Sequence, residues 1–479
     1  MESTTTQQYI YKFRSLNIDQ KTGEPYLYDE LKENYLFFAT PEELNDPMDS
    51  YKNVYWEGDN VLWANLFKHY ILCFESAFAF AIIGKPISKS DDIPVFITKD
   101  EYQEPDLTMI NNIINDLFKR FNLSNFADTI PKNKSKIKKR ELLCVLRMMH
   151  FEVIKTIQKE YLGKGYIKLP LIPERKADIK FDFFKSLLKN PKYGTYTQHN
   201  KWTEFITEFF NKLYEQAYIA SELNNTVKPK EWKFLVFDFP EAYTKSIEKL
   251  MFPTEYISCF SEDYKNTIMW SHYASSHKGV CLIFKPEQQN NLILNYCTGY
   301  HCDKDGSNEI WKYSPVPIKR IKYINSKIPF NFFQFMGVNT KKKCEDWFIY
   351  ENNISKYEMY EGLTENEWRL KYWNGIQDAI ITKYPAWKYE KELRLTLNAP
   401  FGDPYSLPEK RKIKYDFRQL YGVIFGVRTD YYTKLRITKI VHEKCQNDKT
   451  HKINFYQAKF DKRGNVIISQ DELFTIGSK

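Results

Sequence analysis

Apolar and polar positions alternate near both ends of the chain. Residues 9–16 (YIYKFRSL) place an aromatic ring at every second position, and residues 389–397 (YEKELRLTL) place leucines in the same way. Alternation with a period of two is typical of a half-buried strand. In the second stretch it puts Glu390 and Glu392 on one face. Further strands are predicted at 36–39, 256–261, 280–284, 318–324, 421–427 and 453–460.

The middle of the chain has a different pattern. Apolar residues recur at a spacing of three to four, which predicts helices, at 107–128, 141–161 and 201–222. Shorter helices are predicted at 266–274 and 364–383. We therefore expect an α+β fold. Its twisted β-sheet core is formed by both chain ends, residues 1–60 and 250–479, and residues 61–249 form a large all-helical insertion.

One apolar segment is long enough to cross a membrane. Residues 61–83 are mostly apolar, but Lys68, His69 and Glu75 interrupt them. Charges near the centre of a bilayer are costly, so this segment is predicted to be a buried amphipathic helix. The first residues, MESTTT, are polar and precede no apolar stretch of the kind found in secretory signals. We expect a cytoplasmic protein without a membrane segment.

Composition narrows the class of protein. Charged residues make up 27% of the 479 residues, and the net charge is +9, which excludes global disorder and a histone-like polycation. Aromatic residues make up 17%. This excess has two interpretations: stacking platforms for bases or cofactors, or the larger core side chains of a compositionally biased genome. The second is favoured for most of these rings.

The distribution of the cysteines indicates reduced thiols and does not provide a complete set of metal ligands. Eight cysteines are scattered along the chain and several lie in apolar runs, as expected of buried thiols in a reducing compartment. Cys297, His301 and Cys302 form the densest group of metal-binding side chains, but no matching pair of ligands follows them. No metal is therefore expected.

Two lysine runs offer a different function. The stretch 132–140 (KNKSKIKKR) and Lys341-Lys342-Lys343 have the composition of phosphate-contacting segments. A solvated loop or helix start is the competing interpretation of the first run. The residues predicted for a weak nucleic-acid contact are Lys132, Lys134, Lys136, Lys138, Lys139 and Arg140.

Five short stretches together resemble the bacterial domain-of-unknown-function family 2971. They are YKFRSLN at 11–17, ELNDPMD at 43–49, CFS at 259–261, MWSHYA at 269–274 with HKG at 277–279, and WKYEKELR at 387–394. The resemblance covers roughly residues 9–60 and 250–440. Members are mostly shorter, so the helical insertion is a departure from the family, and the family label implies no activity.

Within these stretches the order Arg14, Ser261, Glu390-x-Glu392 resembles one class of ADP-ribosyltransferases. That resemblance implies a split, twisted sheet and NAD as co-substrate. It also implies that Arg14 holds the pyrophosphate, Ser261 braces the site and Glu392 binds the ribose, while Glu390 orients or activates an acceptor. A carboxylate suits this role because cleavage of the nicotinamide–ribose bond develops positive charge.

Other residues of the same stretches are candidates for the site. His272 is a candidate acid–base group or ligand of a substrate base, and Tyr273 a candidate ring for stacking on nicotinamide. Asn45 is expected at the pocket rim and Lys278 near a phosphate. Trp270 belongs to the same aromatic cluster, for which a core role is the alternative. Gly279 is predicted to end a helix with a positive φ.

The leading hypothesis is an NAD-dependent ADP-ribosyltransferase-like effector, a bacterial toxin or phage-defence protein that modifies a macromolecule. It requires Arg14, Ser261 and Glu392 within about 10 Å of one cleft. The competing explanation of Glu390, Glu392 and Arg394 is an exposed salt-bridge ladder across strands. Two further hypotheses are a nucleic-acid-binding protein or nuclease, motivated by the lysine runs, and a non-enzymatic interaction protein.

Overall fold

A computed structural model shows how the chain folds. It describes residues 9–49, 51–120, 123–133, 136–168, 208–223 except 210, 213, 217 and 221, 232–287, 290–303, 306–399, 402–447, 451–468 and 473–477. The fold is of the α+β class, as predicted. The chain divides into two compact units. Unit 1 comprises residues 1–51, 254–327 and 377–479, and unit 2 comprises residues 52–253 and 328–376.

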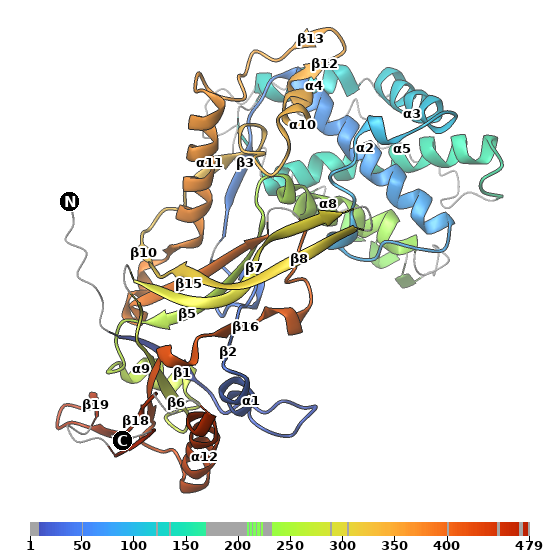
Figure 1. Cartoon of the computed structure of the whole chain (residues 1–479). Helices are drawn as coiled ribbons and strands as arrows, with labels where there is room; N and C mark the ends of the chain where they lie inside the picture. Colours follow the sequence, from blue (N-terminus) through green and yellow to red (C-terminus); the bar gives the residue numbers. More distant parts are fainter. Residues whose placement is uncertain are drawn as a thin grey trace. The chain divides into compact units, whose positions relative to one another are not determined.

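Unit 1 contains the principal sheet, with strands from near both ends of the chain (Figure 1). The strand order is β19-β18-β17-β6-β1-β5-β15-β9, and β20 pairs with β18. The strands are β1 (Ile10–Arg14), β5 (Thr254–Ser261), β6 (Val280–Phe284), β9 (Lys319–Arg320), β15 (Glu392–Ala399), β17 (Leu420–Phe425), β18 (Ile453–Phe460), β19 (Val466–Ile468) and β20 (Phe474–Ile476).

Smaller sheets complete unit 1. One has the order β2-β16-β7-β8, in which β7 and β8 form a long hairpin, and β10 pairs with β14 in parallel. The sequence analysis did not predict this hairpin. The strands are β2 (Tyr35–Phe37), β7 (Asn291–Asp303), β8 (Gly306–Pro317), β10 (Lys322–Tyr323), β14 (Thr382–Lys383) and β16 (Lys412–Tyr415).

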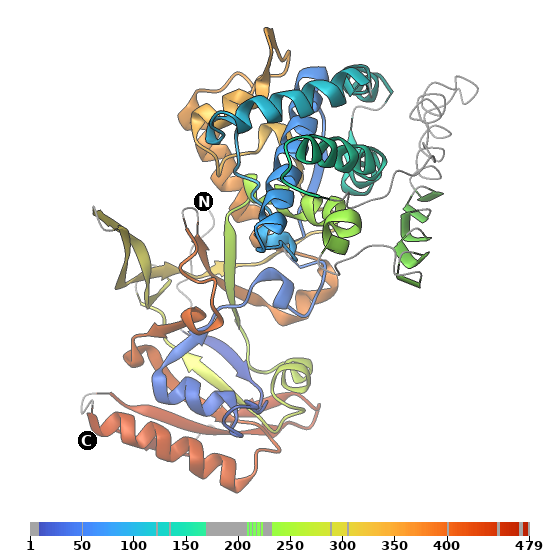
Figure 2. The ribbon, with the colours of Figure 1, turned by 90° about the vertical axis from the view of Figure 1, so that its right-hand side faces the viewer.

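The two faces of the principal sheet are covered differently. Helices α1 (Tyr26–Glu33) and α12 (Tyr431–Asn447) pack side by side in a core with the leucine face of β15 (Figure 2). On the other face α9 (Thr267–Tyr273) packs on Phe13, Cys281 and Ile424. Because side chains alternate along a strand, each residue of β1, β5 or β15 faces either the α1–α12 core or the side of α9.

Three neighbouring strands align the predicted site residues in register. Tyr11 of β1 lies opposite Ser261 of β5, and Ser261 lies opposite Glu392 of β15. The strand order β1-β5-β15 therefore brings the YKFRSLN, CFS and WKYEKELR stretches together. Two of them are separated from the first by about 250 residues of sequence or more.

Unit 2 is mainly helical and contains the predicted helices around residues 107–128 and 141–161. Helix α2 packs on α4, and α5 packs on α3 and α8. The helices are α2 (Asn60–Ile82), α3 (Asp106–Arg120), α4 (Leu123–Asn133), α5 (Lys139–Gly163), α8 (Phe239–Ser246) and α10 (Lys341–Glu345), and α11 (Glu365–Ile380) begins in unit 2 and ends in unit 1.

Residues 328–376 belong to unit 2, although the sequence analysis grouped them with the sheet domain. Short strands join them to the rest of the unit, since β11 pairs with β3 in parallel and β3 pairs with β4. Strand β4 lies inside the segment expected to be all-helical. The strands are β3 (Asn53–Trp56), β4 (Ile137–Lys138), β11 (Pro329–Asn331), β12 (Ile349–Tyr350) and β13 (Asn353–Ile354).

Helix α2 accounts for the long apolar segment. It is buried along most of its length, and the groups that interrupt its apolar run are accommodated inside the unit. The ring nitrogens of His69 lie 2.8 Å from the hydroxyl of Tyr243 and 2.8 Å from the carbonyl of Val95. The carboxylate of Glu75 accepts hydrogen bonds from two tyrosines. In the part of the chain that the structure describes, no helix is long and apolar enough to span a bilayer.

Candidate functional site

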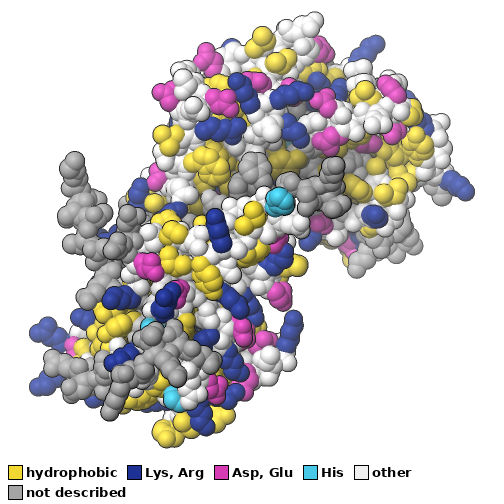
Figure 3. Space-filling model, in the orientation of Figure 1, with side chains coloured by type: hydrophobic (Ala, Val, Ile, Leu, Met, Phe, Trp, Pro, Cys, Tyr) yellow, Lys and Arg dark blue, Asp and Glu magenta, His cyan; other side chains and the backbone are white. Residues whose placement is uncertain are grey.

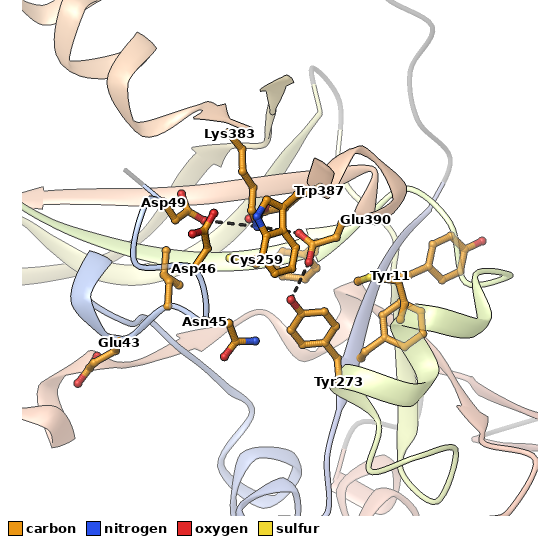
Figure 4. A pocket seen from close by; sticks show the side chains of 15 residues that line it. Tyr11, Glu43, Asn45, Asp46, Asp49, Cys259, Tyr273, Lys383, Trp387 and Glu390 are labelled. Atoms are coloured by element: carbon orange, nitrogen blue, oxygen red, sulfur yellow. Dashed lines mark hydrogen bonds and ion pairs between the residues drawn. The ribbon is translucent and has the colours of Figure 1, made fainter. Parts of the chain in front are cut away.

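A pocket of about 250 Å³ lies in unit 1 beside the aligned row of β1, β5 and β15. Its walls come from segments far apart in sequence: β1, the turn after η1 (Pro41–Glu43), β5, α9, and the stretch from β14 to the start of β15 (Figure 4). The lining residues are Tyr11, Phe13, Glu43, Leu44, Asn45, Asp46, Asp49, Cys259, Phe260, Met269, Tyr273, Lys383, Trp387, Glu390 and Glu392.

The described lining is acidic and aromatic. One of its side chains, Lys383, is a cation, against five carboxylates: Glu43, Asp46, Asp49, Glu390 and Glu392. The aromatic walls are Tyr11, Phe13, Phe260, Tyr273 and Trp387. A pocket with negative charge and ring faces favours a neutral or cationic ligand, since cations are attracted both to carboxylates and to the faces of aromatic rings.

Lys383 connects the carboxylates. It is nearly fully buried, and its Nζ lies 2.7 Å from Glu390 Oε2, 2.9 Å from Glu392 Oε2 and 3.4 Å from Asp49 Oδ2. Burial disfavours its charged form, but the three carboxylates outweigh burial and raise its pKa. Lys383 is therefore a fixed cation. It is positioned by the pairing of β14 with β10, where it lies opposite Tyr323.

Two cations favour the ionised form of Glu392. Its Oε1 accepts a 2.7 Å hydrogen bond from Arg394 Nε, and its Oε2 accepts one from Lys383. Burial would raise its pKa, but Arg394 and Lys383 outweigh that effect and lower the pKa to about 2. Arg394 is fully buried and also donates to Asp49 Oδ2 at 2.5 Å. Glu390, Glu392 and Arg394 therefore belong to a buried ion-pair network and do not form the exposed salt-bridge ladder of the competing explanation.

Glu390 has the opposite electrostatic character. Burial raises its pKa, although Lys383 and Tyr273 oppose the shift. Its Oε1 accepts a 2.6 Å hydrogen bond from the hydroxyl of Tyr273, and the two side chains point toward one another (Figure 4). Two carboxylates whose pKa values are moved in opposite directions are a common arrangement for acid–base chemistry.

The backbone that carries Glu390 and Glu392 differs from the single strand that the alternating pattern predicted. Glu390 ends the 3₁₀ helix η8 (Pro385–Glu390), and Lys391 adopts a left-handed conformation with φ 44°. Strand β15 begins only at Glu392. The prediction that both lie on one strand is therefore wrong, because Glu390 still belongs to η8 and the left-handed Lys391 ends that helix before the strand begins. Both carboxylates nevertheless line the pocket.

Ser261 positions this turn. Its hydroxyl is buried and donates to the carbonyl oxygen of Glu390 at 2.7 Å. It is also 3.2 Å from the backbone N–H of Asp263, which donates to it. Ser261 is not among the lining residues of the pocket. It braces the segment that carries Glu390, in keeping with the bracing role implied by the resemblance.

The structure does not bring Arg14 to the pocket. Tyr11 and Phe13 line the pocket, whereas Arg14 lies at an even position of β1 and faces the α1–α12 side. Its Nε forms a 2.5 Å ion pair with Glu30 Oε2 of α1. Alternation along β1 therefore separates Arg14 from Glu392, and the structure does not place it to hold a pyrophosphate there. The requirement that Arg14, Ser261 and Glu392 lie at one cleft is not met, so any NAD chemistry proposed for the pocket has to stand without Arg14.

The other predicted site residues divide into two groups. Asn45 and Tyr273 line the pocket. Trp270 is fully buried in the core beneath α9, and its Nε1 donates to the carbonyl of Tyr264 at 2.6 Å. His272 and Lys278 are exposed and are not among the lining residues. Trp270 and His272 lie at other positions of α9 than Tyr273, and Lys278 lies in the turn that follows the helix. Their side chains are therefore directed away from the pocket.

The ion-pair partners of the two glutamates, Asp49, Lys383 and Arg394, were not predicted as site residues. Asp49 and Arg394 belong to the ELNDPMD and WKYEKELR stretches, so their positions within those stretches were a usable signal. Lys383 belongs to none of the five stretches, and its role depends on the pairing of β14 with β10. The Cys259 thiol also lines the pocket, but burial raises its pKa and makes it a poor nucleophile.

The lysine runs lie in unit 2 and their described members are partly paired. In the first run, Lys139 lies 2.6 Å from Glu248, Lys136 lies 3.9 Å from Glu57, and Arg140 pairs with Glu208. Lys134 lies outside the described residues. On the face drawn in Figure 3, basic and acidic side chains are interspersed. A nucleic acid would have to displace existing carboxylate partners, so this hypothesis stays a prediction.

No cluster suited to a metal is found among the described side chains. Cys297 and His301 lie on β7, and the Cys302 side chain is outside the described set. Within the described residues, no group of three or more His, Cys, Asp or Glu side chains is arranged to hold an ion. In the pocket, the ammonium of Lys383 lies among the carboxylates.

Comparison with known proteins gives one match. Residues 269–395 match the model of a family described as a protein of unknown function, DUF2971. The matched range includes the MWSHYA and WKYEKELR stretches and therefore α9, Lys383, Glu390 and Glu392. No curated protein and no solved structure matches the chain.

Proposed function

We propose a function from the chemistry of the site, because the family model that matches residues 269–395 is described as of unknown function. In this proposal, unit 1 binds the nicotinamide riboside end of NAD, cleaves the bond between ribose and nicotinamide, and transfers the ADP-ribosyl group to an acceptor. The pair of glutamates with opposite pKa shifts, Glu390 and Glu392, carries the proposal.

The composition of the pocket supports the nicotinamide end of NAD as its ligand. The ring of NAD is a cationic pyridinium. Tyr273 and Trp387 line the pocket, and Lys383 Nζ already lies 4.9 Å from the centre of the Trp387 ring. The five carboxylates outnumber the three cations paired with them, Lys383, Arg394 and Arg411, which favours a positive ligand. The volume of about 250 Å³ suits a ring with its ribose rather than a whole dinucleotide. With one cation in its described lining, the pocket does not fit the pyrophosphate, which would extend beyond it.

The reaction would proceed by charge stabilisation. The bond from ribose C1′ to the ring nitrogen breaks, its electron pair stays on the nitrogen, and neutral nicotinamide leaves. Positive charge then develops on the ribose, where the ionised carboxylate of Glu392 stabilises it. An acceptor hydroxyl or amine attacks C1′, and its proton passes to Glu390. Such proton transfer typically contributes about 10²–10⁴-fold to a rate.

The surrounding residues support these two roles. Arg394 and Lys383 keep Glu392 ionised, so its charge is present whatever the pH near neutrality. Tyr273 and Ser261 fix Glu390, the first by its side chain and the second by its backbone. Holding an acid–base group in place before the substrate arrives reduces the reorganisation needed in the transition state.

The experiment is incubation of the full chain with NAD labelled on the adenylate part. Release of nicotinamide is measured by chromatography, and transfer of label is measured to protein and to nucleic acid separately. Wild type should release nicotinamide. Glu390→Gln should reduce the rate by about 10²-fold or more. It should also lower stability, because Lys383 and Tyr273 lose a buried partner, so the folded fraction of the variant is measured beside its rate.

The matched control is Glu255→Gln. Glu255 is a buried glutamate of the neighbouring strand β5 and is not part of the pocket. Its substitution should leave nicotinamide release unchanged. A wild type that releases no nicotinamide and transfers no label would refute the proposal and would make the network a structural element. An enzyme of the proposed kind would serve as an effector, a toxin or an antiviral defence protein acting on a cytoplasmic macromolecule.

A further inference from the structure

A second cavity lies wholly within unit 2 and has a different character. Its volume is about 400 Å³, within the range of small-molecule sites. Its walls come from the middle of α2, the segment 95–100, residues 339–347 and Ile349. The described lining contains four lysines, Lys68, Lys99, Lys342 and Lys343, against two carboxylates, Asp100 and Asp346.

Two of the lysines form no ion pair with a carboxylate among the described residues. Lys68 and Lys99 are both half-buried. The ammonium of Lys68 lies 4.2 Å from the centre of the Tyr350 ring, and that of Lys99 donates to Asn111 Oδ1 at 2.7 Å. Burial lowers the pKa of Lys68 to about 8, and repulsion from Lys99 adds to the effect. An anionic group bound between Lys68 and Lys99 would stabilise the charged form of both side chains.

The other two lysines of the cavity, Lys342 and Lys343, form only weak ion pairs. Lys342 lies 3.6 Å from Asp100, and Lys343 lies 3.8 Å from Glu101. Both pairs are largely exposed, where an ion pair is weak. Lys343 also donates to the carbonyl of Phe96 at 2.9 Å, which holds it at the cavity. The second lysine run of the sequence thus contributes to this cavity.

An independent observation indicates the kind of ligand. Asn339 lines the cavity and is 6% exposed. Its Nδ2 is buried and has no hydrogen-bond acceptor in the structure. A buried donor without an acceptor is unfavourable, and a ligand oxygen that reached it would supply the acceptor. The amide donor and the ammonium groups require the same partner, a group with several acceptor oxygens.

The remaining walls are apolar. Trp347 is buried between His69 and the rings of Phe332 and Phe333, and its edge reaches the cavity. Phe96 lines the cavity and is 44% exposed, so its ring is open to a ligand. A ligand with an anionic end and a flat apolar end would satisfy both parts of the lining.

We propose that this cavity is a binding site for a phosphate-bearing small molecule of nucleotide type. The phosphate lies between Lys68, Lys99 and Asn339, and the base packs against Phe96. This site is separate from the pocket of unit 1 and does not depend on NAD chemistry there. It gives the helical unit a ligand of its own.

Isothermal titration of the full chain with ADP and with pyrophosphate tests the proposal. Both should bind with a dissociation constant below about 1 mM at low salt, and affinity should fall as salt is raised. Tighter binding of ADP would show that the base contributes. Equal binding would show that the phosphates alone are recognised. Either result supports the phosphate site.

Three variants locate the binding. Lys99→Gln should weaken pyrophosphate binding about tenfold, since loss of one charged hydrogen bond has that effect. Asn339→Asp has nearly the same shape and places a negative charge against the phosphate, so it should weaken binding at least as much. Lys89→Gln, at an exposed lysine of the same unit, should bind as the wild type does.

Two results would overturn the proposal. One is the absence of heat and of any thermal stabilisation with both compounds at about 1 mM. The other is binding that is equal in the wild type and in correctly folded Asn339→Asp, with folding judged by circular dichroism. Since Asn339→Asp preserves side-chain size, the test remains decisive if Lys99→Gln fails to fold.

Discussion

Arg394 is the residue on which the site depends most. Its side chain is fully buried and contacts Glu392, Asp49 and the carbonyl oxygen of Ile380. A buried charge is tolerated only when it is paired, and removal of one partner leaves the other charges uncompensated. Arg394 therefore links the pocket wall formed by β15 to the ELNDPMD turn that forms another wall.

Replacement of Arg394 should unfold much of unit 1. For Arg394→Met we expect a loss of about 3–5 kcal/mol in the free energy of unfolding, because Glu392 and Asp49 would share Lys383 alone. Urea denaturation followed by tryptophan fluorescence measures it. The control is Arg320→Met on the neighbouring strand β9, where the arginine is 71% exposed. Its loss should be below about 1 kcal/mol, and equal losses for the two variants would contradict the prediction.

The family-like stretches identified some of the site residues, but the interactions among those residues could not be predicted from them. Glu390, Tyr273 and Asn45 were identified because they lie in the family-like stretches, and the structure places them at the pocket. The role of Arg14 was inferred from order alone. Its position on β1 turns it to the other face, toward Glu30. Lys383 could not be found, because a two-residue strand leaves no pattern.

Among the elements, the turn between α9 and β6 shows why the HKG stretch has its sequence. The left-handed conformations there belong to Ser275, Ser276 and His277, with φ of 47°, 53° and 70°. Gly279 was predicted to supply the positive φ, and this is wrong. Glycine is required at 279 for space, since an added Cβ would lie 2.2 Å from the carbonyl oxygen of Arg14.

Gly279→Ala should therefore separate β6 from β1. We expect a loss of about 2–4 kcal/mol, because the backbone oxygen of Arg14 cannot move without breaking the β1–β6 pairing. Thermal denaturation of the purified variant measures it. Gly299→Ala on β7 is the control, since no atom lies within 4 Å of an added Cβ there. Gly299→Ala should stay within about 0.5 kcal/mol of the wild type. A Gly279→Ala variant as stable as that control would show the prediction to be wrong.

Elements with a clear hydrophobic period were predicted, and most elements without one were missed. Strands β5, β6, β17 and β18 and helices α3 and α5 lie where their patterns indicated. The hairpin β7–β8 was missed because its sequence mixes polar and aromatic residues, many of them only half-buried. The division at residues 328–376 depends on short strands such as β11, which pair with distant segments.

Across the whole chain, unit 2 is the more sensitive to mild acid, because burial lowers the pKa of two of its histidines, whereas in unit 1 burial lowers the pKa of one, His277. In unit 2, burial lowers the pKa of His69 to about 4 and of His150 to about 3. The unfolded chain binds these protons near pH 6.5, so the stability of unit 2 falls as pH decreases below that value. In unit 1, the pKa of Glu392 is lowered to about 2, and its contribution is lost only below about pH 4.5.

Unit 2 should therefore lose stability first on acidification. Between pH 6.5 and 5.5 each buried histidine lowers stability by about 1 kcal/mol, which hydrogen exchange resolved by mass spectrometry can assign to each unit. His150→Gln should reduce the pH dependence in unit 2. His442→Gln, at an exposed histidine of α12, should not. Faster exchange in unit 1 than in unit 2 at about pH 5.5 would contradict this order.

The discontinuity of both units has a consequence for synthesis of the protein. The chain leaves unit 1 after residue 51 and returns to it at 254 and again at 377. The pocket combines Tyr11 with Glu392, and its sheet requires β17 and β18 as well. A ribosome must therefore translate most of the message before any pocket exists. Every nascent chain shorter than about 400 residues is without the site, so the proposed NAD-consuming activity would begin only when translation is nearly complete.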